Sequence, residues 1–442
     1  MGVEAIDVRP LTLPPGGPRR LLRTLLTGPA TPDRLRRVGA VLVLGCLLFA
    51  VVSALSGASR TEAVQDAGSR LAALNSDTAQ LYQSLADADA MATSGFVAGG
   101  QEPAGVRNRY DEDIARASSR LVQAAGRLPE RDPAQQPIAT IAGSLPEYAE
   151  LIESARVYNR QGLPLGQSYL NSGSQLMREE ILPAAEQLRR LQVAALEADY
   201  RRGGVLPAAA LLIGIAALAA VLDVAVVERR RTNRVLNVGL LLAGVALTAA
   251  LLWWAVALLV AGAHLGDARR HSDAAAALDE ARAAVLQARS NESLVLVARN
   301  GSSTSDADFF DQLSRVLGPD GNGGLLAVAG ATVPAAQLAE TRAATLAWRD
   351  VHRRLRGLDD AGNYRAAVAS AVGTDPTGSG VAFQRLDSTL GGVADGERRA
   401  FGDDLDAAAG VLSAISVGPS ALALTAAAAA AAGIARRVGE YR

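Results

Sequence analysis

Two stretches of the chain decide its fold: VGAVLVLGCLLFAVVSALSGA at Val38–Ala58 and VGLLLAGVALTAALLWWAVAL at Val238–Leu258. Neither contains a charged residue, and the second begins 200 positions after the first. A helix of ~20 apolar residues crosses the hydrocarbon core of a bilayer, where only a backbone that satisfies its own hydrogen bonds is stable. Each stretch therefore predicts a transmembrane helix.

A long, polar, Ala-rich segment and then a second apolar stretch follow each of these helices. The sequence therefore predicts an all-α integral membrane protein with four transmembrane helices and two tandem extracytoplasmic domains. The expected parts are a cytoplasmic tail (1–37), a membrane helix (38–58), an outer domain (59–202), a membrane helix (203–227), a cytoplasmic hinge (228–237), a membrane helix (238–262), an outer domain (263–410), a membrane helix (411–434) and a cytoplasmic tail (435–442).

The distribution of arginine predicts the orientation. The chain has no lysine and a net charge of −1, whereas the two tails and the hinge together carry 14 Arg and 5 acidic residues. Short basic segments remain on the cytoplasmic side of a membrane. We therefore expect a multi-pass protein of the plasma membrane with both termini in the cytoplasm. The first apolar run is longer than the core of a secretory signal, which favours a retained helix.

Heptad spacing organises the outer domains. Val64, Leu71, Thr78 and Leu85 lie seven positions apart, as in helices packed at shallow angles. Gly and Pro clusters then divide the first domain into four amphipathic helices, which predicts an up-down four-helix bundle. The second domain repeats the pattern with a shorter second helix and a break at 373–380. We therefore expect two tandem extracytoplasmic up-down four-helix bundles.

Polar residues at the turns farthest from the membrane are candidates for binding a ligand or a partner: Gln101, Arg160, Gln161, Arg299 and Asn300. A second hypothesis places an acidic small molecule against bundle residues, with solvated helix faces as the alternative: Arg70, Tyr169, Arg270, Arg289, Asn291 and Tyr364.

On the inner side, the hinge residues Arg230, Arg231 and Arg234 are candidates for docking a cytoplasmic partner. Arginines there also fix topology and contact anionic lipid. Asp223 is the one ionisable residue within a membrane segment, and such residues are functional candidates. Pairing with a nearby hinge arginine is the simpler interpretation of Asp223.

The sequence contains no constellation that supports catalysis, so we predict no enzyme activity and no cofactor. His264 and His271 lie one heptad apart with Asp267 between them, a set that favours polar helix residues over a metal site. Asp320–Gly324 lacks the acidic positions of a calcium loop and predicts a glycine-rich turn. Cys46 is the single cysteine, which excludes an intrachain disulfide. Exclusive use of Arg reflects codon bias, so no nucleic-acid partner is expected.

A bundle whose end helices continue into membrane helices is similar to the sensor domain of bacterial chemoreceptors and histidine kinases. This chain differs from them because it has no cytoplasmic catalytic or coiled-coil domain. The stretch LMREEILPAAE at Leu176–Glu186, together with the tandem form, resembles the GlnX group of actinobacterial membrane sensors. That resemblance implies a link between an extracytoplasmic amino-acid-binding protein and a soluble Ser/Thr kinase.

Three functional classes fit this plan: a signal transducer, a structural protein of the cell envelope and a permease subunit. A permease needs a cytoplasmic coupling helix for an ATPase, and the hinge is short for one. An envelope protein is compatible with every feature. Helices that continue from the outer turns to the cytoplasm favour a transducer, because packed helices transmit displacement.

Overall fold

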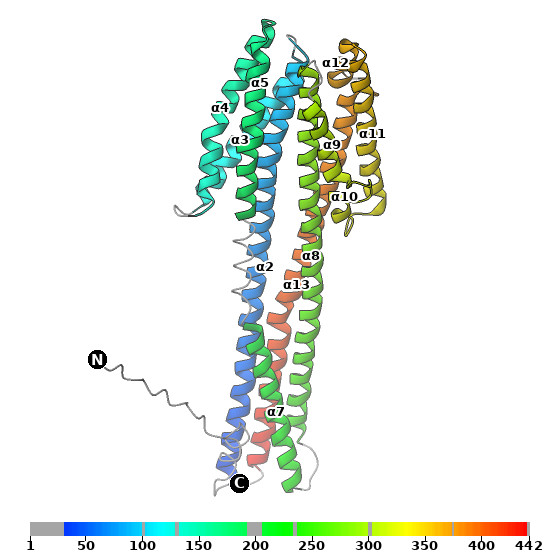
Figure 1. The fold of residues 1–442 in the computed structure, drawn as a ribbon. Helices are drawn as coiled ribbons and strands as arrows, with labels where there is room; N and C mark the ends of the chain where they lie inside the picture. The colour runs from blue at the N-terminus through cyan, green and yellow to red at the C-terminus, as the bar shows by residue number, and fades with distance from the viewer. Residues whose placement is uncertain are drawn as a thin grey trace, which may run out of the picture. The chain divides into compact units, whose positions relative to one another are not determined.

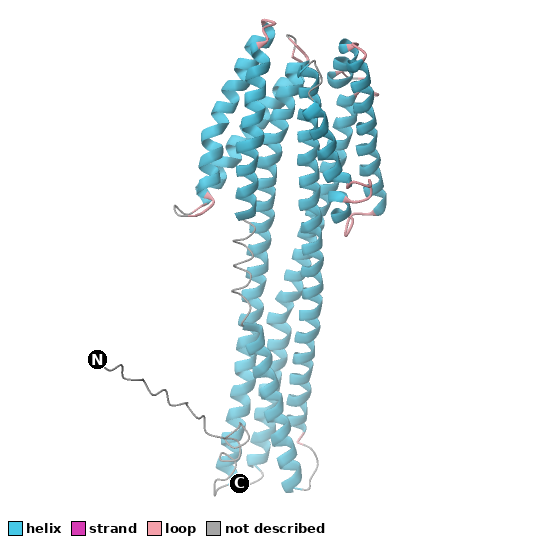
Figure 2. Cartoon of the chain, viewed as in Figure 1, coloured by secondary structure: helices cyan, strands magenta, loops and turns pink. Residues whose placement is uncertain are grey.

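The computed structural model describes residues 31–99, 102–128, 132–191, 206–232, 237–298, 303–373 and 375–439. All regular secondary structure in these ranges is helical, which confirms the predicted all-α class (Figure 2). The helices are α2 (Thr31–Val97), α3 (Ala104–Arg127), α4 (Gln135–Arg160), α5 (Leu165–Leu176), η1 (Met177–Ile181), α7 (Leu206–Thr232), α8 (Val238–Ala298), α9 (Ser303–Leu317), α10 (Gly324–Ala329), α11 (Ala335–Asp360), α12 (Tyr364–Val372) and α13 (Ser379–Gly439).

Four helices in the described part of the chain are long and apolar enough to cross a membrane. The candidate spans are Arg36–Ser59 in α2, Ala209–Val227 in α7, and stretches within α8 and α13. Leu44, Leu212 and Leu259 are more than half exposed, as expected for side chains that face lipid. The prediction of four membrane-spanning helices is thus supported by helix length and composition.

The chain divides into two compact units. The span unit comprises residues 1–62, 204–260 and 410–442, and the polar unit comprises residues 63–203 and 261–409. Helices α2, α8 and α13 each contribute residues to both units.

Small residues allow close helix contacts in the span unit. A Cβ atom added at Gly239 of α8 would lie 2.5 Å from the Cα of Gly433 in α13, so only glycine fits there. Asn237 donates from Nδ2 to the Gly433 carbonyl at 3.2 Å, and its Oδ1 accepts from the Gly239 N–H at 3.1 Å. In the same unit, the Trp254 Nε1–H donates to Ser53 Oγ at 3.0 Å. These contacts fix the register of α8 against α13 and of α2 against α8.

The polar unit has two halves (Figure 1). Helices α3, α4, α5 and η1 lie beside α2, and helices α9 to α12 lie beside α8 and α13. Tyr148 and Ile181 are fully buried in the first half, as are Trp348 and Phe309 in the second. The break between α12 and α13 falls within the expected interval 373–380.

Hydrogen bonds between α2 and α8 join residues about 200 positions apart. Ser94 and Ser293 share one of 3.2 Å, Ser290 Oγ donates to Asp89 Oδ2 at 2.6 Å, and Arg282 donates to Gln83 Oε1 at 3.2 Å. Their sequence separations are 199, 201 and 199. The two helices are therefore parallel and in register at the offset that separates the two apolar stretches.

Two elements differ from the expectation. The helix that follows the 161–164 turn contains a π-helical turn, η1, just before Pro183. Proline has no N–H to donate and its ring clashes with the preceding turn, and a wider turn accommodates both effects. In the second half, α10 adds a short helix after the glycine turn, where Gly318, Gly321 and Gly324 all have positive φ.

Candidate functional site

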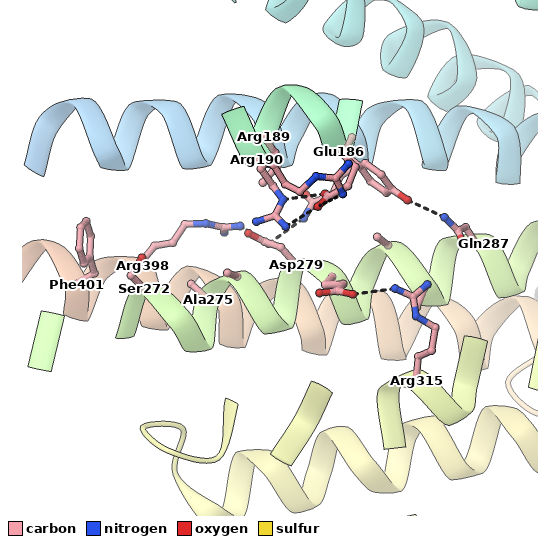
Figure 3. A pocket seen from close by; sticks show the side chains of 17 residues that line it. Glu186, Arg189, Arg190, Ser272, Ala275, Asp279, Gln287, Arg315, Arg398 and Phe401 are labelled. Atoms are coloured by element: carbon pink, nitrogen blue, oxygen red, sulfur yellow. Dashed lines mark hydrogen bonds and ion pairs between the residues drawn. The ribbon is translucent and has the colours of Figure 1, made fainter. Parts of the chain in front are cut away.

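The cavities of the polar unit include two that are lined by charged side chains, and the larger of this pair lies between α2, the helical segment 182–191, α8, α9 and α13 (Figure 3). Its volume is about 320 Å³, within the range of small-molecule sites. Small side chains open the space, and an aromatic ring lies at one end: Ala79, Ala275, Ala276, Ala283, Ala284 and Phe401.

Four arginines and three carboxylates line this cavity: Arg189, Arg190, Arg315, Arg398, Glu186, Asp279 and Glu280. Arg398 pairs with Asp279, and Arg315 donates to Glu280 at 2.8 Å. Arg189 holds Glu186 through two bonds of 2.8 and 2.7 Å. The lining therefore has one more positive than negative group, and that excess lies nearest Arg190.

The hydroxyl of Tyr82 is a neutral hydrogen-bonding group in the cavity. Gln287 Nε2 donates to Tyr82 Oη at 2.7 Å. Burial raises the pKa of Tyr82 to about 12, so the phenol keeps its proton at physiological pH.

The smaller cavity, of about 250 Å³, lies between α2, α3 and α8. Its charged residues are Asp87, Asp113, Arg116, Arg120 and Arg282. Burial, followed by the charge of Asp87, raises the pKa of Asp113 to about 7. Asp87 Oδ1 and Asp113 Oδ2 find no donor among the described residues, and a neutral Asp113 that donates to Asp87 satisfies both. The smaller cavity therefore contains a hydrogen-bonded pair of acidic side chains, Asp87 and Asp113.

The two cavities use corresponding positions of α2 and α8. Gln80, Gln83, Ser84 and Asp87 line the smaller one, while Glu280, Ala283, Ala284 and Gln287, each 200 positions later, line the larger one. The arginines of the neighbouring helices also correspond: Arg120 of α3 donates to Gln80 at 2.6 Å, as Arg315 of α9 donates to Glu280.

A ladder of ion pairs and hydrogen bonds connects the two cavities. Arg109 donates to Asp87 at 2.7 Å and to Asp387 of α13 at 3.3 Å. Arg282 donates to the same Asp387, at 2.5 Å, and to Gln83, whose Nε2 donates to Asp279 at 2.9 Å. Four helices of both halves are thus tied through charged side chains.

Buried polar clusters lie nearby in each half. In the second half, the Glu292 carboxylate accepts from Arg289, from Ser379 Oγ at 2.5 Å and from His352 Nδ1 at 3.0 Å, and both Glu292 and His352 are 0% exposed. Burial opposes ionisation of Glu292, but the His352 bond and the charges of Arg289 and His352 lower its pKa to about 2. His352 Nε2 also lies 3.0 Å from Asp306 Oδ1, so both ring nitrogens face carboxylate oxygens.

The first half has a different cluster. Asp89 accepts from Ser174 Oγ at 2.8 Å, from Ser290 Oγ at 2.6 Å and from the Tyr148 hydroxyl at 3.4 Å. All three donors are neutral hydroxyl groups. The carboxylate is therefore satisfied by hydrogen bonds instead of by a buried cation.

Several candidates lie outside the described residues: Gln101, Arg234, Arg299 and Asn300. Arg230 and Arg231 belong to the last turns of α7, and Asp223 is an exposed residue of the same helix. Arg160 and Gln161 are exposed at the end of α4.

Among the six bundle residues that were candidates for an acidic ligand, the side chain of Arg70 lies outside the described part of the structure, and none of the other five lines either cavity. Arg289 and Asn291 are buried and hydrogen-bonded, Tyr169 stacks on Tyr158 with ring centroids 5.4 Å apart, and Arg270 pairs with Asp267.

The histidines on α8 pair with acids of α13. His264 Nδ1 lies 3.1 Å from Asp404 Oδ1, and His271 Nδ1 lies 2.7 Å from Glu397 Oε2. In the part of the chain that the structure describes, no group of three or more His, Cys, Asp or Glu side chains is arranged to hold a metal ion.

The arginines of the larger cavity were not among the predicted site residues. The doublets Arg189-Arg190 and Arg398-Arg399 each precede a predicted membrane segment, at 203–227 and 411–434, and α8 carries the alanine run 274–277. Together these features were a usable signal for a polar cavity with space inside it.

Residues 63–201 match the family model described as an actinobacterial sensor domain. The match covers about a third of the chain and includes the first half of the polar unit. It supports a sensory role for a protein of actinobacterial origin, and the four apolar helices support a membrane protein. No curated protein and no solved structure matches the chain.

Proposed function

We propose that this chain is a transmembrane sensor that relays an extracytoplasmic cue to a soluble cytoplasmic partner. The match of residues 63–201 to a sensor domain carries the proposal, on a chain in which α2, α8 and α13 each contain a candidate span and part of the polar unit. In this proposal the chain is not an enzyme, and displacement of helices is the signal.

The two halves of the polar unit are, in this proposal, diverged copies of one four-helix bundle. Support comes from the hydrogen bonds between residues 199 to 201 positions apart and from the corresponding linings of the two cavities. An internal pair of bundles places a pseudo-two-fold axis between α2 and α8, so a change in one half is transmitted to the other.

The partners follow from the resemblance to the GlnX group. On the outer side, a solute-binding protein that reports amino-acid availability contacts the distal turns. On the inner side, a Ser/Thr kinase or another soluble effector docks at the hinge through Arg230, Arg231 and Arg234. The span unit ties this hinge to the end of α13, because Asn237 contacts Gly433.

Topology is tested first. A reporter active only in the cytoplasm should work when fused after Arg442 or inserted at Asn233, and should be silent when inserted at Gly100. Activity at Gly100 would place the polar unit in the cytoplasm and end the proposal.

Partner capture tests the relay itself. A photo-crosslinking residue at Asn233 should capture a soluble protein in living cells, and the yield should change between nutrient-rich and nutrient-poor medium. The triple variant Arg230→Gln, Arg231→Gln, Arg234→Gln should lose both the capture and the change in cytoplasmic phosphorylation. Arg436→Gln with Arg437→Gln, a basic pair at the end of α13, is the matched control. An unchanged response in a correctly inserted triple variant removes the hinge from the mechanism, and capture of envelope proteins alone favours a structural role.

A further inference from the structure

We propose that the larger cavity of the polar unit binds a small organic carboxylate, with its acid group on Arg190 and Arg189 and its body against the alanines of α8. The existence of this site depends only on the cavity, while its role as the sensed cue rests on the proposed function.

The charged groups of the larger cavity favour an anionic ligand. The cavity lining has four guanidinium groups and three carboxylates, and Arg398 also pairs with Asp395 outside the lining, so Arg190 is the guanidinium with the least carboxylate contact. Among the described residues, Arg190 has a single partner: its NH1 lies 3.5 Å from Glu186 Oε1, an oxygen that also accepts from Arg189 at 2.7 Å. One carboxylate thus serves two guanidinium groups. A guanidinium has five N–H donors arranged to bind carboxylates in pairs, and most of those of Arg190 are available.

The larger cavity also has space and apolar surface for the body of the ligand. Five alanines surround the charged groups, so an apolar body fits beside the acid group. Phe401 and Arg398 lie at the same end of the cavity, and Gln287 and Arg315 lie toward the other (Figure 3). The protonated Tyr82 hydroxyl offers a neutral partner for a second polar group of the ligand. This lining differs from that of a simple anion site, which has no need of an apolar wall.

The smaller cavity supplies the contrast. Three arginines and two aspartates line it, and each arginine pairs with a carboxylate of the protein: Arg116 with Asp113, Arg120 with Asp77 and Arg282 with Asp387. The proposal is therefore specific to one of two cavities that share helices α2 and α8. A ligand there touches both halves, because the segment 182–191 belongs to the first and α9 to the second.

Binding is measured by calorimetry on the full chain in detergent, with succinate, benzoate, inorganic phosphate and the uncharged benzamide as probes. We expect succinate or benzoate to saturate with Kd below ~10 mM, and Arg190→Gln to weaken it roughly tenfold or more. Arg190 is 63% exposed, so this variant should fold. Arg353→Gln, an equally exposed arginine paired with Asp350 outside the cavity, is the matched control and should bind as the unmodified chain does.

A second variant blocks the site without a change of charge. Ala276 is an exposed residue in the cavity wall, so Ala276→Trp fills the space while the core is unaltered, and it should abolish the binding heat. The proposal is overturned if neither carboxylate saturates, if benzamide binds as well as benzoate, if phosphate alone binds, or if Arg353→Gln weakens binding as much as Arg190→Gln. Saturable binding in a chain that captures no cytoplasmic partner would instead overturn the proposed relay and leave the site in place.

Discussion

The two halves of the polar unit hold their buried acidic side chains in opposite electrostatic environments. In the first half, burial and then the charge of Asp87 raise the pKa of Asp113 to about 7, and Asp89 is held by hydroxyl groups. In the second half, Glu292 remains ionised between Arg289 and His352. The same helical framework therefore tolerates a neutralised acid on one side and a buried ion cluster on the other. This difference shows that buried polar groups of opposite character distinguish the two halves.

The largest effect on stability is expected when the buried ion cluster around Glu292 is broken. Glu292→Gln leaves Arg289 and His352 without their shared carboxylate in a site that is 0% exposed, so the free energy of unfolding should fall by about 3–5 kcal/mol. Chemical denaturation of the full chain in detergent, followed by circular dichroism, measures it. A loss below about 1 kcal/mol would mean that water reaches the cluster.

The next prediction concerns pH. The folded-state pKa of Asp113, about 7, is above its ordinary value of 3.8, so the folded protein binds more protons in this window. Stability should therefore fall by up to about 4 kcal/mol as pH rises from about 4 to about 7, and should then be constant for this group. Asp113→Asn should flatten that dependence.

Glu292 provides the opposite sign for the same measurement. Its pKa is lowered from 4.5 to about 2, so its contribution is present above pH 4.5 and is lost as pH falls toward 2. Glu292→Gln should leave the dependence between about pH 5 and about pH 7 unchanged. If Asp113→Asn also leaves this pH dependence of stability unchanged, the Asp87–Asp113 pair is not its source.

A smaller effect is expected at Asp89. Its three partners are hydroxyl groups, which donate equally to an amide oxygen, so Asp89→Asn should cost about 1–2 kcal/mol of unfolding free energy. The same denaturation assay measures it. A cost equal to that of Glu292→Gln would break the comparison between the halves.

The smallest effects on stability are expected at Arg315 and Arg120, the corresponding arginines of the two cavities. Arg315 and Glu280 are both 48% exposed, so Arg315→Gln should change the unfolding free energy by less than about 0.5 kcal/mol. Arg120 contacts both Asp77 and Gln80 and is more buried, so Arg120→Gln should cost about 1 kcal/mol. Thermal unfolding of the two variants side by side gives the order, and a reversed order would contradict it.

Much of the fold is predictable because it depends on local signals. Apolar runs of membrane length identify α2, α7, α8 and α13, and the Gly and Pro clusters mark the helix breaks, including the one between α12 and α13. The wider turn η1 was not predicted, since a proline within a helical pattern does not by itself indicate one: η1 precedes Pro183, whereas α4 continues as an α-helix past Pro146.

The site was far less predictable, because it depends on which arginines point inward. All four arginines of the larger cavity have acidic neighbours in sequence, as most of the 44 basic residues do. The Asp306–His352–Glu292 contacts join three helices, and no spacing within one helix indicates them. Helix rotation and packing decide these contacts.

The π-helical turn η1 affects the larger cavity through the rotational phase of the helix that follows it. A π turn holds about one residue more than an α-helical turn, and each residue of an α-helix rotates the chain by about 100°. Glu186, Arg189 and Arg190 all follow that turn. Because the wider turn holds one extra residue, deletion of one residue within Met177–Ile181 would give a regular α-helical turn and leave the three charges facing the cavity. Deletion of one residue between that turn and Glu186 would instead rotate all three charges by about 100°. In evolutionary terms, η1 is a position where the chain can gain or lose one residue while this wall of the cavity is kept.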